Sequence, residues 1–150
     1  MQLIDAGTPA TLAASVRARF HEVFGEEPTT VGRAPGRVNL IGEHTDYNAG
    51  LCLPVALPHA TYAAVRLRED GVIRLRSAQA DDTWEGTLAD VGPGHPRGWP
   101  AYVAGVLWAL ADVGYAVPGV DVVIDSTVPV GAGLSSSAAI ECSVAAAVVA

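Results

Sequence analysis

The chain has 150 residues, of which 50% are hydrophobic and 17% are charged, so its composition is that of one globular domain rather than of a disordered segment. Its formal net charge of −7 argues against nucleic acid as a partner, because a nucleic-acid-binding surface is normally basic. All nine positively charged side chains are arginines, and the lack of lysine excludes a lysine-containing phosphate loop and a Schiff-base lysine.

The ends of the sequence carry no targeting or membrane signal. An early aspartate and the lack of a basic region at the N-terminus predict that there is no signal peptide. The uncharged run after Glu141 is much shorter than the roughly 20 residues that cross a bilayer, so we expect no membrane partner. Cys52 and Cys142 have neither metal nor redox spacing, which favours reduced thiols and a cytoplasmic protein.

The first half of the chain predicts one helix and several strands. Residues 8–25 have the periodicity of a helix that ends at Gly25. Residues 61–79 alternate apolar and arginine side chains on both sides of Asp70-Gly71, which predicts a β-hairpin, and residues 83–88 are expected to add a third strand. The apolar face of the helix is predicted to comprise Leu12, Val16, Phe20, Val23 and Phe24.

The second half predicts a helix, a strand and a second helix. Residues 99–114 form an amphipathic pattern with Pro100 in the first turn, residues 119–128 form a strand, and residues 129–150 run from a glycine-rich loop into a helix. No repeat or linker divides the chain, so we expect one α+β unit. The last helix has no end signal before Ala150, which suggests part of a longer protein. The apolar face of the first of these helices comprises Tyr102, Val103, Val106, Leu107 and Leu110.

The segment PVGAGLSSSAA has the layout of an anion site at a helix N-terminus. Gly131 and Gly133 allow the backbone to approach a phosphate, and the free N–H groups at the helix start then face it. The serine hydroxyls that follow can bond phosphate or Mg²⁺, a cation that prefers oxygen ligands. The alternative is a plain turn with a serine N-cap. A strand followed by two glycines and three serines favours the anion site over this alternative. These serines are Ser135, Ser136 and Ser137.

The segment GRVNLIGEHTDYNAG begins like a strand and gathers many hydrogen-bonding side chains. Arg37 presents a fork of donors that suits phosphate oxygens. Glu43 and Asp46 can accept hydrogen bonds from neighbouring hydroxyls, and His44 can donate or accept. Carboxylates beside a histidine suit a sugar.

Two other interpretations of this segment stay open. Glutamate, histidine and aspartate are possible metal ligands, so a metal cluster is a rival to the sugar site. A solvated loop without a ligand is the second alternative. We expect Asn39 and Asn48 to pin the loop backbone rather than to bind a ligand.

GRVNLIGEHTDYNAG resembles the galactokinase signature, and PVGAGLSSSAA resembles the phosphate motif of the GHMP small-molecule kinases. The two motifs lie in the expected order, WPAYVAGVLWAL is similar to the helix between them, and the resemblance runs from about Thr29 to Ala150. It implies the N-terminal domain of a GHMP-type kinase, a mixed sheet with packed helices like domain 2 of ribosomal protein S5. It also implies that residues 1–150 form the galactose- and ATP-binding domain of a truncated galactokinase, without its C-terminal domain.

The resemblance further implies that the γ-phosphate of ATP is transferred to the anomeric hydroxyl of α-D-galactose with the help of Mg²⁺. Arg37 would lie between the sugar O1 and the γ-phosphate. Ser77 and Trp99 would lie near the adenine, and Ser137 would ligate Mg²⁺. The residues expected to hold the sugar are Glu43, His44, Thr45 and Asp46. Those expected to hold the phosphates are Gly131, Ala132, Gly133, Leu134, Ser135, Ser136 and Ser137.

In the family, the catalytic aspartate and the acidic Mg²⁺ ligand lie after the segment that matches the last helix. We therefore expect residues 1–150 alone to phosphorylate galactose very slowly. Two alternatives stay open: a kinase for a related sugar such as N-acetylgalactosamine or arabinose, and a non-catalytic sensor that binds galactose and ATP.

Overall fold

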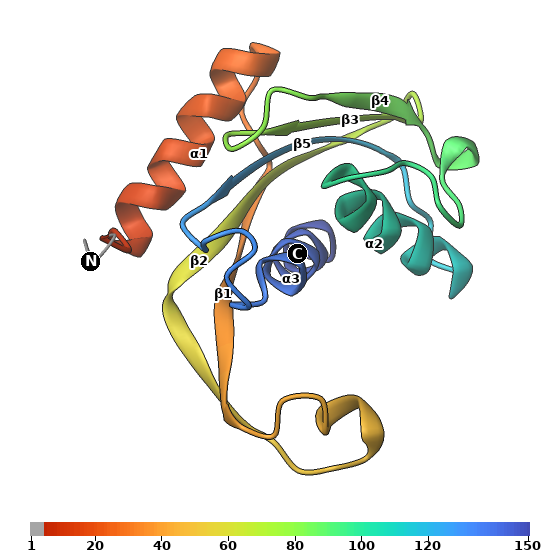
Figure 1. Ribbon diagram of the computed structural model, residues 1–150. Coiled ribbons are helices and arrows are strands. Elements are labelled where there is room, and N and C mark those ends of the chain that lie inside the picture. The colour runs from red at the N-terminus through yellow and green to blue at the C-terminus, as the bar shows by residue number, and fades with distance from the viewer. Residues whose placement is uncertain (1–4) are drawn as a thin grey trace.

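A computed structural model describes residues 5–150, which form a mixed five-stranded sheet with helices on both faces. The sheet has the strand order β1-β2-β5-β3-β4. Helix α1 covers one face, and α2 and α3 cover the other (Figure 1). This is the predicted α+β fold. The bounds are α1 (Pro9–Phe24), β1 (Thr30–Ile41), β2 (Leu53–Arg68), β3 (Val72–Ser77), β4 (Trp84–Thr87), α2 (Pro100–Asp112), β5 (Gly119–Ser126) and α3 (Ser136–Val148), with short 3-10 turns at Asp46–Asn48 and Leu88–Asp90.

Helix α1 begins and ends with local signals that the sequence contains. Thr8 caps its start by accepting a hydrogen bond from the Thr11 N–H, and Gly25 ends it with a φ of 73°. Val16 and Phe20 are fully buried against the sheet, as predicted. Val23 is 41% exposed, so the prediction that it joins this face is wrong. None of the helices among the described residues is long and apolar enough to cross a membrane.

Strands β2 and β3 exist as predicted, but they do not form a hairpin. Strand β5 lies between them, antiparallel to β2 and parallel to β3. The first six residues of β5 are buried, so this strand is most stable at the centre of the sheet, with a hydrogen-bonded neighbour on each side. The turn at Asp70 is still closed locally, because Asp70 accepts a hydrogen bond from the Val72 N–H and pairs with Arg68. The Asp70-Gly71 signal therefore predicted correctly where the two strands end, but the prediction that they pair with each other is wrong.

Three of the four alternating arginines of β2 and β3 converge on one buried carboxylate in β5. Asp121 is 0% exposed, and its carboxylate lies 2.6 Å from Arg74 Nε, 2.8 Å from Arg66 Nη2 and 3.2 Å from Arg68 Nη1. Burial alone raises the pKa of Asp121, but the hydrogen bonds and charges of the three arginines outweigh it and lower the pKa below its ordinary value. This cluster ties β2, β3 and β5 together.

The second core lies between the sheet and helices α2 and α3. Val103 and Leu107 of α2 are fully buried there, as predicted, whereas Tyr102 on the same predicted face is 40% exposed. Gly32 of β1 lets α3 come very close, because a Cβ atom at that position would lie 2.0 Å from the Ser143 carbonyl oxygen. This contact fixes the position of α3 and hence of the loop before it.

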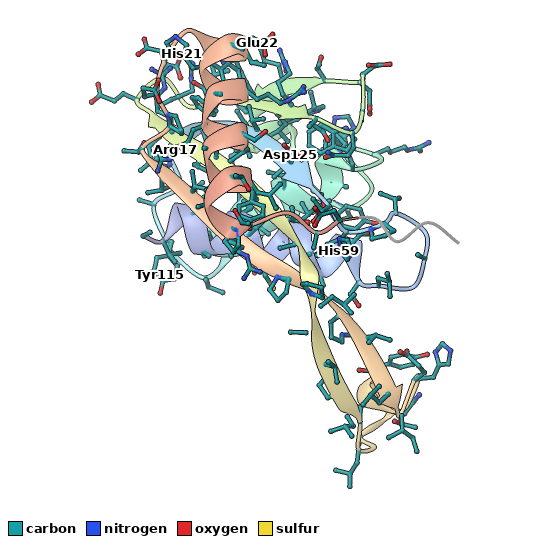
Figure 2. The ribbon with its side chains drawn as sticks, turned by 90° about the vertical axis from the view of Figure 1, so that its left-hand side faces the viewer. Arg17, His21, Glu22, His59, Tyr115 and Asp125 are labelled. Carbon is teal, nitrogen blue, oxygen red and sulfur yellow. The ribbon has the colours of Figure 1, made fainter. Side chains whose placement is uncertain are left out.

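Beyond this body, β1 and the first part of β2 continue as a two-stranded ribbon, residues 38–55, which we call the arm. No helix of the body lies against the arm in either view (Figures 1 and 2), and in Figure 2 side chains stand free around it. His59 lies where the arm leaves the body (Figure 2). The register between the two strands shifts at Pro35/Arg37 and again at Asn39/Ile41, which marks the base of the arm and its outer part as irregular.

Candidate active site

The loop between β5 and α3 has a backbone suited to anions. It has positive φ at every second residue: 74° at Gly131, 70° at Gly133 and 59° at Ser135. Such an alternation turns successive N–H groups toward one point and forms a nest that binds anions. The two glycines adopt this conformation without strain, whereas a serine with positive φ is uncommon and often marks a functional constraint.

Ser135 is also the N-cap residue of α3, but it does not cap in the usual way. Its side chain makes no capping hydrogen bond within the described part of the chain. The N–H groups of the first turn are therefore not satisfied by this hydroxyl, contrary to the plain N-cap alternative. The nest, the helix start and the three serines together offer donors to a bound phosphate.

This loop borders a cavity of about 370 Å³. Ser77 and Trp99, which lie far from the loop in the sequence, line the same cavity as Gly131, Ser136 and Ser137. The structure thus brings together five of the nine residues expected to bind ATP. The other four, which are not among the cavity-lining residues, are Ala132, Gly133, Leu134 and Ser135.

Sequence reasoning did not identify several other residues that line the cavity. Tyr102 lies one helical turn after Trp99, so both aromatic rings border the cavity, and the spacing of three could have revealed it. Gln79 is held rigidly, because its Nε2 donates to Asp125 Oδ1 at 2.8 Å and its Oε1 accepts from the Ser126 N–H at 3.1 Å. No local signal indicated Gln79, whose position depends on how the segment after β3 runs beside β5.

Strand β1 lies directly against the nest. The backbone N–H of Arg37 donates a hydrogen bond to the Leu134 carbonyl oxygen at 3.0 Å. The preceding residue, Gly36, permits this approach, because a Cβ atom there would lie 3.0 Å from Leu134 O and 3.0 Å from Val128 Cγ1. The strand with the sugar-like motif and the loop with the phosphate-like motif are thus joined at one point.

The residues predicted to bind the sugar lie at the tip of the arm. Glu43, His44 and Thr45 are all exposed, and the side chain of Asp46 lies outside the described residues. His44 has a φ of 67°, and its Nδ1 forms a hydrogen bond with the Tyr47 hydroxyl. The structure therefore places these side chains together on one loop, at the edge of open solvent.

Internal hydrogen bonds hold the tip in shape. The Thr45 hydroxyl contacts two carbonyl oxygens, Gly42 O at 2.7 Å and Leu51 O at 2.9 Å, so it closes the loop. Asn48 Nδ2 donates to the His44 carbonyl oxygen at 2.7 Å, which confirms that Asn48 pins the backbone. Asn39 differs from that expectation, because it is only 8% exposed and its Nδ2 has no hydrogen-bond partner among the residues that the structure describes.

The described residues contain no group of three histidine, cysteine, aspartate or glutamate side chains placed to hold a metal ion. Within the cavity, the polar side chains that offer oxygen ligands are hydroxyls and one amide. They are Ser77, Gln79, Tyr102, Ser126, Ser136 and Ser137.

Two family descriptions match separate parts of the chain. The galactokinase galactose-binding signature matches residues 18–67, which include β1, the arm and most of β2. The GHMP kinases N-terminal domain matches residues 101–150, which include α2, β5, the nest and α3. The hydrogen bond between Arg37 and Leu134 connects one matched part to the other.

Curated relatives and solved structures agree with these matches. Galactokinase of Streptomyces coelicolor is 56% identical over 87% of this chain and 34% of its own length, and galactokinase of Chloroflexus aurantiacus is 47% identical over 85% and 33%. The structure of Lactococcus lactis galactokinase complexed with galactose matches with a TM-score of 0.76 and 36% identity, over 87% of this chain and 34% of that one. Methanococcus jannaschii mevalonate kinase, at 19% identity and a TM-score of 0.65, shares the fold. The chain spans about a third of the length of the curated relatives it matches.

Proposed function

The chain belongs to the galactokinases within the GHMP kinase family, and we propose that it supplies part of the site for ATP-dependent phosphorylation of α-D-galactose at its anomeric hydroxyl. The observation that carries this proposal is the 3.0 Å hydrogen bond from the Arg37 N–H to Leu134 O. It joins the strand that carries the galactose-binding signature to the nest, so Arg37 lies at the point where the two motifs contact each other.

The nucleotide half of the proposal rests on the nest and the cavity beside it. The nest and the start of α3 suit the phosphates, since their N–H groups are fixed before the ligand arrives. Trp99 and Tyr102 offer aromatic faces to an adenine, and Ser77 adds a hydroxyl to the lining of the same cavity. Trp99 is held in place, because its Nε1 donates to Asp82 Oδ1 at 3.1 Å.

The sugar half rests on the tip of the arm. We propose that Glu43, His44 and Asp46 bind the sugar hydroxyls, since carboxylates and imidazole match hydroxyl donors and acceptors. Thr45 has its hydroxyl engaged with two carbonyl oxygens of the loop, so we assign it the shaping of the loop.

The reaction forms a bond between the sugar O1 and the γ-phosphorus and breaks the bond from that phosphorus to the oxygen that leaves with ADP. The chain has no lysine, so Arg37 is the side chain proposed to stabilise charge on the transferring group. The proton of O1 passes to a carboxylate, which the resemblance assigns to a part of galactokinases that this chain does not span. Residues 1–150 therefore provide binding and positioning.

Mg²⁺ fits the donor set beside the nest. The Ser137 hydroxyl lines the cavity next to Ser136, and a single protein hydroxyl suits a cation that keeps several waters and takes its other ligands from phosphate. When bound, the ion would neutralise phosphate charge during transfer. We also place the protein in the cytoplasm, in keeping with its two free, exposed cysteines, Cys52 and Cys142.

Calorimetric titration of the chain with galactose and with a non-hydrolysable ATP analogue plus Mg²⁺ tests the division of the site. We expect Ser137→Ala to lower the affinity for the analogue by about tenfold, because one hydrogen bond or metal contact to the ligand is lost, and to leave the affinity for galactose unchanged. Glu43→Gln should lower the affinity for galactose and leave the affinity for the analogue unchanged. Ser15→Ala on α1 and Glu85→Gln on β4, both exposed positions, serve as controls. If Glu43→Gln reduced nucleotide affinity and spared galactose, the sugar assignment would be wrong.

A turnover assay with ATP and galactose tests whether residues 1–150 lack the group that accepts the proton of O1. We expect the chain alone to work far below the rates of roughly 1–100 s⁻¹ that are typical of kinases. A rate in that range would show that residues 1–150 contain the base.

A further inference from the structure

His44, at the tip of the arm, is held in place at its backbone and at its ring. Its φ of 67° lies in the left-handed region, which residues with a side chain adopt uncommonly. Its carbonyl oxygen accepts a hydrogen bond from Asn48 Nδ2 at 2.7 Å. Its imidazole forms a hydrogen bond with the Tyr47 hydroxyl through Nδ1, and the two rings meet edge-on with their centroids 5.8 Å apart. Because backbone strain persists only where the surroundings hold it, these contacts point to a side chain that must keep one orientation.

The local fold of the tip brings Tyr47 to His44. Tyr47 lies in the 3-10 turn Asp46–Asn48, three residues after His44. Side chains three residues apart lie above one another in such a turn, and the Asn48 N–H closes it by donating to Thr45 O at 3.0 Å. Tyr47 is 71% exposed, so its ring adds little to either apolar core. The contact with His44 is the hydrogen bond that its hydroxyl makes among the described residues.

This hydrogen bond determines which nitrogen of His44 carries the proton. A neutral imidazole has one nitrogen that donates and one that accepts, and the partner of one nitrogen fixes the role of the other. A phenol gives up its proton more readily than a neutral imidazole N–H does, so the Tyr47 hydroxyl donates and Nδ1 accepts. The proton of the ring is then on Nε2, on the other side of the ring from Nδ1.

A donor at Nε2 complements the other groups at the tip. An ionised carboxylate such as that of Glu43 can only accept hydrogen bonds, whereas a sugar hydroxyl both donates and accepts. The Thr45 hydroxyl and Asn48 Nδ2 already donate to carbonyl oxygens of the loop. The Nε2–H of His44 can therefore donate to the oxygen of a sugar hydroxyl, while a carboxylate accepts from a hydroxyl hydrogen.

We propose that Tyr47 is a positioning residue for His44. Its hydroxyl holds the imidazole by Nδ1, keeps the ring proton on Nε2, and so presents a fixed N–H donor to a galactose hydroxyl. Fixing the donor before the sugar arrives reduces the entropy lost on binding. This inference rests on the proposed sugar half of the site and adds to it a residue that does not itself contact the sugar.

Tyr47→Phe removes only the hydroxyl, and calorimetric titration of the chain measures the result. We expect the affinity for galactose to fall by about fivefold, because one hydrogen bond that orients the donor is lost. The affinity for the ATP analogue and the Tm should stay unchanged. Tyr115→Phe is the matched control, because Tyr115 is also exposed, at 64%, and lies on the body rather than on the arm (Figure 2).

A double-mutant cycle and a spectroscopic measurement separate positioning from other roles. If Tyr47 acts through His44, Tyr47→Phe should have no further effect on galactose affinity in a His44→Ala chain. Two-bond ¹H–¹⁵N NMR spectra of the free chain at about pH 8, where an ordinary histidine is neutral, show which ring nitrogen is protonated. We expect the proton of His44 on Nε2 in the parent chain, and a second population with the proton on Nδ1 in Tyr47→Phe.

Three results would overturn the positioning role. They are a parent chain with the proton of His44 on Nδ1, spectra that Tyr47→Phe leaves unchanged, and an equal loss of galactose affinity from Tyr47→Phe with or without His44. Full affinity in Tyr47→Phe and a loss in Tyr47→Ala would show instead that the ring itself contacts the sugar. If the parent chain did not bind galactose, the proposed sugar half would be wrong, and the spectra, recorded without sugar, would still decide whether Tyr47 sets the state of His44.

Discussion

Gly36→Ala is the substitution that tests most directly whether β1 and the nest are locked together. The new Cβ would lie 3.0 Å from Leu134 O, 3.0 Å from Val128 Cγ1 and 3.2 Å from Val128 Cγ2. The Val128 side chain can rotate, but a backbone oxygen cannot, so the strand and the loop must separate by a few tenths of an ångström. That separation stretches the 3.0 Å hydrogen bond between the Arg37 N–H and Leu134 O.

The expected cost of Gly36→Ala follows from opposing terms. Overpacking a tight contact costs about 1–3 kcal/mol, and weakening one hydrogen bond costs about 1 kcal/mol. Replacing glycine by alanine restricts the unfolded chain and returns about 0.4–1 kcal/mol. The free energy of unfolding should therefore fall by about 1–3.6 kcal/mol. Because the nest moves with Leu134, affinity for the ATP analogue should fall by about tenfold, which corresponds to about 1.4 kcal/mol.

Urea unfolding and calorimetric titration measure the two effects, and two other glycines bracket them. Gly92→Ala is the matched control, because its Cβ would meet no atom within 4 Å and its φ is ordinary. Gly32→Ala is the severe case, because its Cβ would lie 2.0 Å from Ser143 O, and it should destabilise more than Gly36→Ala. If Gly36→Ala unfolded at the same urea concentration as Gly92→Ala and bound the analogue equally well, the strand and the loop would not be locked.

The other predictions concern the buried ion cluster, the tip of the arm and the nest. Asp121→Asn should lower the free energy of unfolding by about 3–5 kcal/mol at pH 7, since it leaves three arginines without their shared carboxylate. The pKa of Asp121 is lower in the folded than in the unfolded chain, where it is about 3.9. The ionised carboxylate therefore stabilises the fold above that pH, and this stabilisation is lost as the pH falls through the pKa of the folded state. Thermal scans across pH 2–7 should show this loss in the parent chain and not in Asp121→Asn. Thr45→Val keeps the volume and removes the contacts to Gly42 O and Leu51 O, so titration should show weaker galactose binding with unchanged nucleotide binding. Ser135→Gly relieves the positive φ of 59° and should raise the Tm; nucleotide affinity falls at the same time only if the Ser135 hydroxyl or the rigidity of the nest contributes to binding.

Features set by neighbouring residues could be predicted from the sequence. The cap at Thr8, the stop at Gly25 and the turn from β5 into α3 depend on residues within a few positions, and the structure contains all three. The separation of β2 from β3 by β5 could not be foreseen, because it depends on an apolar strand much later in the chain that pairs with the same edges of β2 and β3. Asp121 gave no signal for the same reason, since its arginine partners come from other strands.

The candidate site divides in the same way. The nest could be derived from glycines and serines alone, whereas the assignment of Ser77 and Trp99 came from a resemblance and became a shared cavity wall only in three dimensions. Gln79 was missed because its position is fixed by Asp125 and Ser126 of β5, a strand that comes much later in the sequence. The arm was missed because an apolar run such as Leu51 to Val55 predicts a buried strand, and here its side chains are exposed.

Stability and function occupy different parts of this fold. The body is held by two apolar cores and by the buried cluster at Asp121. Trp99, which is proposed to contact adenine, packs against one of these cores, whereas the nest and the tip of the arm lie outside them. Positive φ at non-glycine residues, by contrast, occurs within the described chain at His44, Ala49 and Ser135, at the tip of the arm and in the nest. Strained backbone persists only where the surrounding structure holds it. The nest has that support from β1 and α3, and the tip of the arm has it from the hydrogen bonds of Thr45 and Asn48 to carbonyl oxygens of the same loop.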